Sequence, residues 1–248
     1  MHANRWSCPA TIFDIQTSKV TSMPQNPIVV FDLDGTLADT VNDLLSALNR
    51  TLARQTLPHF TRTDFARLSG YGGMRGMIKH AFEAADIPLA PHKHTQLFAE
   101  TVRDYDENIA VETQLYPGAR DCLDRLSNVG CGLAVCTNKP CKQANKLLQE
   151  LNVAHKFAAI TGGDSFDRQK PDPSHLMNTI DMAGGCHKRA IMVGDSEVDV
   201  LAGRNAGVPV IAVDFGYAHV PVETFAPEAV ISHFDHLFEH ACGMLRLL

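Results

Sequence analysis

Two aspartates stand at the end of an apolar run near the start of the chain. In "VVFDLDGTLADT", residues 29–40, the run stops at Asp32, and Asp34 follows after one leucine. Residues i and i+2 of an extended segment point the same way, so both carboxylates are expected to face one pocket. Gly35 permits the tight turn that would follow. Because two carboxylates this close repel each other, we expect a nearby cation to keep them ionised.

Other polar residues follow later apolar runs. They are Thr137 and Asn138 in "AVCTNKP", Lys170 in "RQKPDP", and Asp195 and Asp199 in "IMVGDSEVD". Ligands of an open α/β sheet bind beyond the carboxyl ends of its strands, so these residues would meet at one edge. Magnesium is commonly held by a few carboxylates and waters. We therefore predict a Mg²⁺ site at Asp32, Asp34 and Asp195.

This set of residues suits phosphoryl transfer. An aspartate can attack phosphorus covalently, while a neighbouring acid protonates the leaving oxygen and later activates water. We predict Asp32 as the nucleophile and Asp34 as the general acid/base. Lys170 would neutralise charge on the transferring group, and the Thr137 hydroxyl and nearby backbone N–H groups would donate hydrogen bonds to its oxygens. The predicted substrate-binding residues beside these are Gly35, Thr36 and Asn138.

Alternating apolar runs and amphipathic segments must position this site. The predicted strands are residues 28–31, 132–136, 157–160, 190–193 and 210–213. Most are continuously apolar, which is typical of parallel strands covered on both faces. The predicted helices between them are residues 119–128, 140–151, 173–183 and 198–206. This order indicates an α/β fold with a doubly wound, Rossmann-like parallel sheet.

A helical insertion interrupts the α/β pattern. Residues 40–113 have helical spacing, as in "DTVNDLLSALNRTLARQ", and contain no convincing strand. The turn "YPGAR" would mark the return to the sheet. We predict an N-terminal extension (residues 1–26), in which Met23 could be the true start. The α/β core would comprise residues 27–38 and 114–248, and a small helical cap residues 39–113.

Four segments resemble the motifs of one enzyme family. In order, "DLDGTLADT", "CTNKP", "KPDP" and "VGDSEVD" resemble those of the haloacid dehalogenase-like (HAD) phosphohydrolases, and the resemblance extends from residue 27 to the C-terminus. It implies that Asp32 forms an aspartyl-phosphate, that Asp34 is the acid/base and that Thr137 binds phosphate. It further implies that Lys170 stabilises charge and that Asp32, Asp195 and the Asp34 backbone carbonyl form a magnesium site. Asp199, acting through water or Lys170, and Ser196 would be supporting residues.

Within this family the chain is most similar to the phosphoglycolate phosphatases. The similar stretches are "SGYGGMRGMIKHAF" in the predicted cap and "VPVIAVDFGYAHVPVETFAPEAVISHF" near the end. This similarity implies 2-phosphoglycolate, a small phosphorylated acid, as the substrate. Glycines around Tyr71 and Arg75 would let the backbone approach such a ligand, and the Arg75 guanidinium would pair with its carboxylate. The alternative is a glycine-rich hinge with Arg75 in solvent.

Several other functions would share part of this pattern. A phosphatase for another small phosphate, or a sugar phosphomutase, would share all four motifs and differ in the cap. A dehalogenase would not require Asp34 or the pair of Asp195 and Asp199. An aspartate-phosphorylated receiver would not carry Asp-x-Asp after its first strand and would have no need of a cap. A non-catalytic protein that binds a phosphorylated ligand is the remaining alternative, and the competent residue at every catalytic position disfavours it.

Composition argues against other partners. The chain of 248 residues is 45% hydrophobic and has a net charge of -6, with no Lys/Arg run that would follow a nucleic-acid backbone. It has no apolar run long enough for a membrane span. Its seven cysteines include no C-x-x-C pair, so we expect reduced thiols in a cytoplasmic protein.

Some residues near the motifs have plausible structural roles. Asp39 could cap the first cap helix, and Asp172 before Pro173 is typical of a helix N-cap. Cys136, next to Thr137, should point into the sheet packing. These residues are therefore left out of the predicted site.

Overall fold

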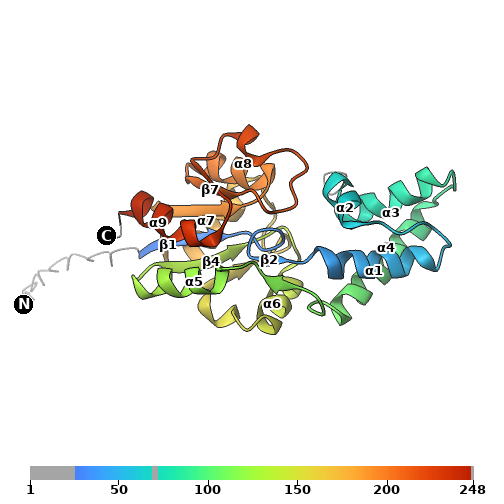
Figure 1. Cartoon of the computed structure of the whole chain (residues 1–248), viewed down its shortest axis with the longest axis horizontal. Helices are drawn as coiled ribbons and strands as arrows, with labels where there is room; N and C mark the ends of the chain where they lie inside the picture. Colours follow the sequence, from blue (N-terminus) through green and yellow to red (C-terminus); the bar gives the residue numbers. More distant parts are fainter. Residues whose placement is uncertain (1–25, 69–71, 247–248) are drawn as a thin grey trace, which may run out of the picture.

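The chain folds into a sheet flanked by helices and a separate group of helices. The computed structural model describes residues 26–68 and 72–246. In Figure 1 the sheet and its flanking helices form one end of the molecule, and the helices of residues 41–107 form the other. Residues 1–25 of the predicted extension, with Met23, lie outside the described residues, as do Gly70 and Tyr71. Asn26 is already in the first strand.

Six parallel strands form the main sheet, in the order β5-β4-β1-β6-β7-β8. They are β1 Asn26–Phe31, β4 Gly132–Cys136, β5 Ala159–Thr161, β6 Gly185–Gly194, β7 Val210–Val213 and β8 Ala229–Ile231. After Asn26, every residue of the central strand β1 is buried, which accounts for its unbroken apolar sequence. The predicted α/β fold with a parallel sheet is confirmed.

Helices cover both faces of this sheet. They are α5 Ala119–Asn128, α6 Cys141–Glu150, α7 Pro173–Met182, α8 Glu197–Ala206 and α9 Phe234–Leu245. Val29 and Phe31 of β1 share an apolar core with α5, α6 and α9. Ile28 and Val30, which point the other way, share a second core with α7 and α8. Successive side chains of a strand alternate between faces, so one apolar run supplies both cores.

Two elements near the C-terminus escape the sequence prediction. β8 has only three residues, too few to show a pattern. The helix α9 does bury residues at helical spacing, including Phe234, Leu237 and Ala241, so its signal is present in the sequence. Two short 3-10 turns complete the sheet unit, at Ala154–Lys156 and Val222–Phe225.

The inserted helices form a small cap with its own core. They are α1 Val41–Ala53, α2 Arg62–Leu68, α3 Gly73–Ala84 and α4 Pro91–Glu107. Leu48, Leu52, Met77 and Leu97 are fully buried among them. The predicted helical insertion is therefore confirmed.

Two linkers join the cap to the sheet unit. Their short strands β2 Ala38–Asp39 and β3 Gln114–Leu115 pair antiparallel. The buried carboxylate of Asp43 in α1 accepts hydrogen bonds from the Thr113 backbone N–H and hydroxyl, at 2.9 and 2.7 Å. This contact ties the outgoing chain to the returning one at the base of the cap.

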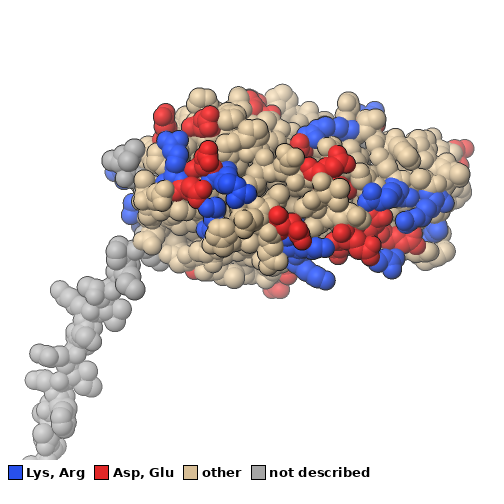
Figure 2. Space-filling model, turned by 60° about the horizontal axis from the view of Figure 1, so that its bottom comes forward, with Lys and Arg blue, Asp and Glu red and all other residues tan. Residues whose placement is uncertain are grey.

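Both signs of charge are mixed on the surface. Figure 2 shows acidic and basic side chains interspersed on the face it presents. Ion pairs at the surface include Arg62 with Asp39 and Arg168 with Asp172, at 2.8 and 3.1 Å. Within residues 26–68 and 72–246, no helix has the length and apolar character needed to cross a membrane.

Candidate active site

The register of the sheet brings three strand ends together. Phe31 of β1 pairs with Val135 of β4 and Val193 of β6, and the Asp32 N–H donates to the Val193 carbonyl at 2.8 Å. The chain passes from one side of β1 to the other between β5 and β6, so this edge is a topological switch point. The residues that follow these strands emerge side by side.

A cleft of about 520 Å³ lies at this edge. It is lined by Asp32, Asp34, Phe65, Asp195, Ser196, Glu197, Val198, Tyr217, Ala218, His219, Val220 and Phe225. Phe65 belongs to α2 of the cap, whereas the other lining residues belong to the sheet unit. Both aspartates of the first motif therefore line the same space.

Asp32 is held by Lys170. The buried Lys170 ammonium donates to Asp32 Oδ1 at 2.9 Å, and among the described residues no donor lies within hydrogen-bond distance of Oδ2. Burial raises the pKa of Asp32 to about 6, although the Lys170 ammonium opposes the rise. For Lys170, burial alone would lower the pKa, but the carboxylates of Asp199 and Asp32 raise it above its usual range. This arrangement would leave one oxygen of Asp32 available for the predicted attack on phosphorus.

Asp195 is fixed by the loops around it. Its Oδ1 accepts from the Thr36 hydroxyl at 3.1 Å, and its Oδ2 accepts from the Tyr217 N–H at 2.7 Å. A Cβ atom at Gly35 or Gly216 would lie 2.5 or 2.3 Å from Asp195 Oδ2, so both close approaches require glycine. Gly35 also has a φ of +83°, as its predicted turn requires. Burial, with repulsion from Asp199 and Asp32, raises the pKa of Asp195 to about 8.

Thr36 lies directly beside Asp195. Thr36 is fully buried, and its hydroxyl donates to Asp195. Its side chain therefore positions the Asp195 carboxylate, and a direct contact of Thr36 with a substrate stays a prediction.

Asp199 and Ser196 support the site through a helix cap. Ser196 is the N-cap of α8, and its hydroxyl donates to Asp199 Oδ2 at 2.6 Å. The other oxygen of Asp199 accepts from Lys170 at 2.6 Å. The capping box thus orients the carboxylate that holds Lys170.

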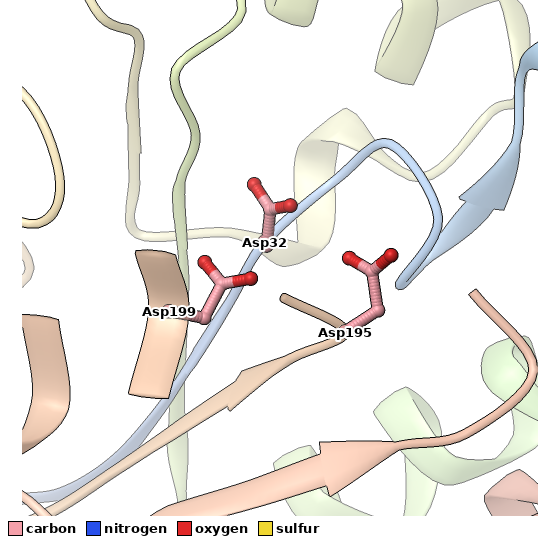
Figure 3. Close-up of side chains that lie close together, drawn as sticks. All are labelled: Asp32, Asp195 and Asp199. Atoms are coloured by element: carbon pink, nitrogen blue, oxygen red, sulfur yellow. The ribbon is translucent and has the colours of Figure 1, made fainter. Parts of the chain in front are cut away.

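Three carboxylates form a cluster that suits a divalent cation (Figure 3). Oxygens of Asp32, Asp195 and Asp199 lie within 4.8 Å of one another. These are buried oxygen ligands whose repulsion a divalent cation would relieve, so the residues fit a hard ion such as Mg²⁺. Of these three residues, Asp32 and Asp195 line the cleft, so they are the two carboxylates best placed to hold a metal there.

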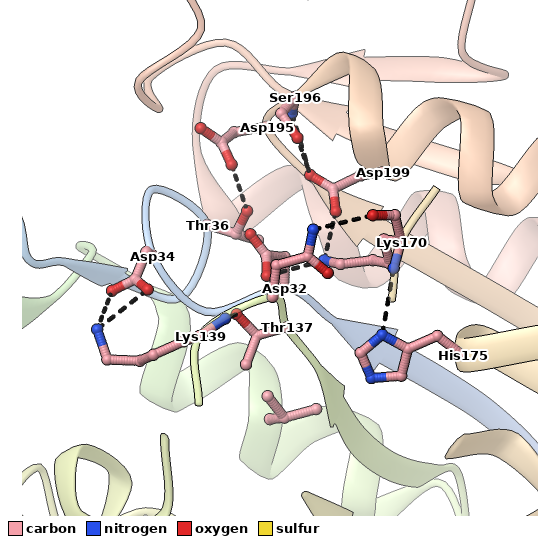
Figure 4. A network of polar contacts seen from close by, with 12 residues as sticks. Asp32, Asp34, Thr36, Thr137, Lys139, Lys170, His175, Asp195, Ser196 and Asp199 are labelled. Atoms are coloured by element: carbon pink, nitrogen blue, oxygen red, sulfur yellow. Dashed lines mark hydrogen bonds and ion pairs between the residues drawn. The ribbon is translucent and has the colours of Figure 1, made fainter. Parts of the chain in front are cut away.

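The Asp34 carboxylate lies apart from this cluster, contrary to its predicted place among the metal carboxylates. The tight turn of residues 33–38 directs it toward Lys139, whose ammonium donates to its two oxygens at 2.9 and 3.1 Å (Figure 4). The Tyr105 hydroxyl accepts a third hydrogen bond from the same ammonium at 2.8 Å. The spacing of Asp32 and Asp34 could not show this separation, because it depends on residues far along the chain.

The remaining core residues of the prediction tie neighbouring loops together. Thr137 is buried at the end of β4, where its hydroxyl accepts from the Lys139 N–H at 3.2 Å. The Asn138 side-chain amide donates to the Lys170 carbonyl at 3.0 Å. Behind Lys170, the buried His175 accepts the Lys170 N–H at Nδ1, at 3.3 Å. The loops that carry Thr137 and Lys170 are thus connected directly.

Arg75 is not brought to the cleft. Its guanidinium lies over the Phe98 ring at 3.9 Å, and His94 contacts its carbonyl at 2.9 Å. Arg75 is exposed at the start of α3. Of its predicted surroundings, Gly72, Gly73 and Gly76 lie within the described residues.

Three residues near the motifs were predicted to have structural roles, and two of these predictions are confirmed. Asp172 is the N-cap of α7 and accepts from the Ser174 N–H, and Cys136 is fully buried, both as predicted. The prediction for Asp39 is wrong, because Thr40 is the N-cap of α1. Asp39 instead accepts from the Tyr217 hydroxyl at 2.9 Å.

Tyr217 is a residue that the sequence analysis misses. Its backbone holds Asp195, while its hydroxyl accepts from the N–H groups of Thr40 and Val41 at the root of the cap. Its ring meets Phe65 edge-on, with 5.5 Å between centroids. The segment "FGYAH" carries no motif that would signal these contacts.

The chain belongs to the family of haloacid dehalogenase-like hydrolases. The family's sequence model matches residues 29–213. The resemblance of the four motifs is therefore confirmed.

Relatives within the family indicate a narrower group. The phosphoglycolate phosphatase of Mesorhizobium japonicum is 46% identical over 211 residues, which cover 85% of this chain and 92% of that protein. That of Agrobacterium fabrum is 46% identical over 218 residues, covering 88% and 93%. The crystal structure of a predicted phosphoglycolate phosphatase from Haemophilus somnus has a TM-score of 0.82 and 28% identity, covering 88% of this chain and 99% of that one.

Proposed function

We propose that this protein is a magnesium-dependent phosphatase that hydrolyses 2-phosphoglycolate to glycolate and phosphate through an aspartyl-phosphate. The observation that carries the proposal is the placement of Asp32, held at one oxygen by Lys170 and facing a cleft beside Asp195. The identity of 46% with two phosphoglycolate phosphatases over most of their length supports the substrate.

The proposed reaction has two displacements at phosphorus. An oxygen of Asp32 attacks phosphorus, the bond to the glycolate oxygen breaks, and Asp34 gives that oxygen a proton. Asp34 then takes a proton from water as the water oxygen attacks phosphorus, and the bond to Asp32 breaks. Inorganic phosphate leaves, Asp32 is again a carboxylate and Asp34 is again protonated. Lys170 neutralises charge on the phosphoryl oxygens in both steps, and Thr137 and Asn138 border the same edge.

Asp32 and Asp195 would hold Mg²⁺ in this enzyme. When bound, the ion supplies positive charge that offsets the charge of the phosphoryl oxygens. Residues 39–113 would act as the cap, which reaches the cleft through Phe65. The cysteines that the structure describes, from Cys122 to Cys242, are free thiols, and this supports a reducing compartment such as the cytoplasm.

Phosphate release from a panel of small phosphomonoesters tests the proposal. The panel contains 2-phosphoglycolate and sugar phosphates, assayed with Mg²⁺ and then with a chelator. We expect release to depend on Mg²⁺ and to be fastest with 2-phosphoglycolate. Preferred cleavage of another ester would contradict the substrate, whereas interconversion of sugar phosphates without release would indicate a mutase.

A further inference from the structure

Lys139 is a buried cation that the reaction described above does not use. Its side chain is 4% exposed, whereas that of its partner Asp34 is 24% exposed. Its ammonium donates three hydrogen bonds, two to Asp34 and one to Tyr105. Burial alone would lower the pKa of Lys139, but Asp34 and Tyr105 raise it above its usual range. Such a buried charge requires full pairing, so its position is tightly determined.

The backbone of Lys139 and the segment that carries Tyr105 are both fixed by hydrogen bonds. The Lys139 N–H donates to the Thr137 hydroxyl, which anchors the backbone of the lysine just after the end of β4. Tyr105 is fully buried in the last turn of α4, and the neighbouring Asp106 accepts from Gln143 of α6 at 2.6 Å. The end of the last cap helix is therefore docked on the sheet unit where it meets the ammonium.

The position of the Asp34 carboxylate depends on this lysine. Gly35 turns the backbone immediately after Asp34, and the ion pair with Lys139 holds the side chain apart from the cluster of Asp32, Asp195 and Asp199 (Figure 4). We propose that Lys139, with its ammonium held by Tyr105, is a positioning residue that sets where the Asp34 carboxyl group lies, both when it gives a proton to the leaving oxygen and when, as the carboxylate that is paired here, it takes one from water. This inference rests on the proposed phosphatase function.

Esters with different leaving groups distinguish a positioning role of Lys139 from a merely structural one, because a structural defect would lower kcat/KM for all of them alike. The alkoxide of an alkyl ester is a poor leaving group and needs a proton as the bond breaks, whereas 4-nitrophenolate leaves without one. Because kcat/KM reports the steps up to formation of the aspartyl-phosphate, a misplaced Asp34 should lower kcat/KM for 2-phosphoglycolate far more than for 4-nitrophenyl phosphate.

The test compares Lys139→Met, Lys139→Arg and Tyr105→Phe on these two esters. Since a general acid contributes about 10²- to 10⁴-fold, we expect Lys139→Met to lose about 100-fold on 2-phosphoglycolate and about threefold or less on 4-nitrophenyl phosphate. Lys139→Arg keeps the charge and should recover part of the loss. Tyr105→Phe keeps the ring but removes the hydroxyl that accepts from Lys139, so it should lose about three- to tenfold on 2-phosphoglycolate alone. Lys142→Met, at an exposed position of α6, is the matched control and should change neither value.

The outcomes separate this inference from the proposed function. If the wild type cleaves both esters and Lys139→Met loses equally on both, Lys139 does not act through the leaving group and the inference is wrong, while the phosphatase stands. If the wild type cleaves neither ester, the proposed function fails and the inference fails with it. Thermal unfolding checks each variant, and Tyr105→Phe carries the test should Lys139→Met not fold.

Discussion

The two sides of the cleft hold their aspartates with different parts of the molecule. On one side, Lys170 binds Asp32 and Asp199, and all three residues come from the sheet unit. On the other side, Lys139 binds Asp34, and Tyr105 of the cap helix α4 completes the contact. Residues of the sheet unit alone therefore build the side of Asp32, whereas the side of Asp34 depends on the docking of the cap.

This difference gives the lysines separable effects. Lys170 lies against Asp32, the proposed nucleophile, so its charge should act on every phosphoryl group. Lys139 contacts Asp34 instead, so in the proposed reaction its effect should follow the leaving group. Variants on the two sides should therefore give different patterns across substrates.

The largest effect is expected from Asp32→Asn. An amide cannot attack phosphorus as a carboxylate does, so turnover should fall by on the order of 10⁴-fold or more. The fold should persist, because burial already disfavours the Asp32 charge. Phosphate release and thermal unfolding measure the two expectations, with the exposed Asp121→Asn in α5 as the control. Substantial residual activity would exclude Asp32 as the nucleophile.

Lys170→Met should have the next largest effect. Removing a charge that stabilises the transferring group costs about 10²- to 10³-fold. Unlike Lys139→Met, it should lower kcat/KM similarly for 2-phosphoglycolate and 4-nitrophenyl phosphate. Lys142→Met is again the control. A loss confined to 2-phosphoglycolate would mean that the two lysines do not differ as their contacts indicate.

The pH dependence of stability tests the contact between the buried His175 and the Lys170 backbone. Burial, and then the charge of Lys170, lowers the pKa of His175 to about 4. Between about pH 6.5 and pH 4 the unfolded chain binds a proton that the folded chain does not, so the free energy of unfolding falls as pH falls. As the pH falls through this range, the free energy of unfolding of His175→Gln should decrease by about 1–3 kcal/mol less than that of the wild type.

Urea unfolding at several pH values measures this difference. The exposed His236→Gln should keep the slope of the wild type. An unchanged slope in His175→Gln would show that His175 is already protonated, and so differently bonded, in the folded protein.

The smallest effect is expected from Arg75→Ala. Loss of the contact with Phe98 should cost about 0.5–1 kcal/mol of stability, and kcat/KM for 2-phosphoglycolate should stay within about twofold. Arg103→Ala, an exposed arginine of α4, is the matched control. A rise in KM of about tenfold or more, in Arg75→Ala alone, would show that the cap does carry Arg75 to the substrate carboxylate.

The sheet side of the site could be predicted from the sequence because it follows from local patterns. Asp32, Thr137 and Asp195 each come directly after an apolar run, and parallel register then aligns the strand ends. The predicted contact between Asp199 and Lys170 also follows, since both belong to recognisable motifs. The short strand β8 escaped prediction because three residues show no period.

The cap side could not be predicted because its contacts join distant residues. Lys139 stands 105 residues from Asp34, and Tyr217 stands 177 residues from Thr40. Neither pairing leaves a pattern in one sequence. The spacing of Asp32 and Asp34 predicted that both carboxylates share one metal site, but tertiary contacts place Asp34 apart, beside Lys139.

The most direct test of the central role of Asp32 is to trap the phosphorylated enzyme. Asp34→Asn should react with 4-nitrophenyl phosphate, which needs no proton to leave, and then stall because no base activates water. Mass spectrometry after acid quenching should find one phosphoryl group on the peptide that contains Asp32, and none in the double variant with Asp32→Asn. A phosphoryl group on another residue, or release of nitrophenolate with no labelled enzyme at any time, would contradict an aspartyl-phosphate at Asp32.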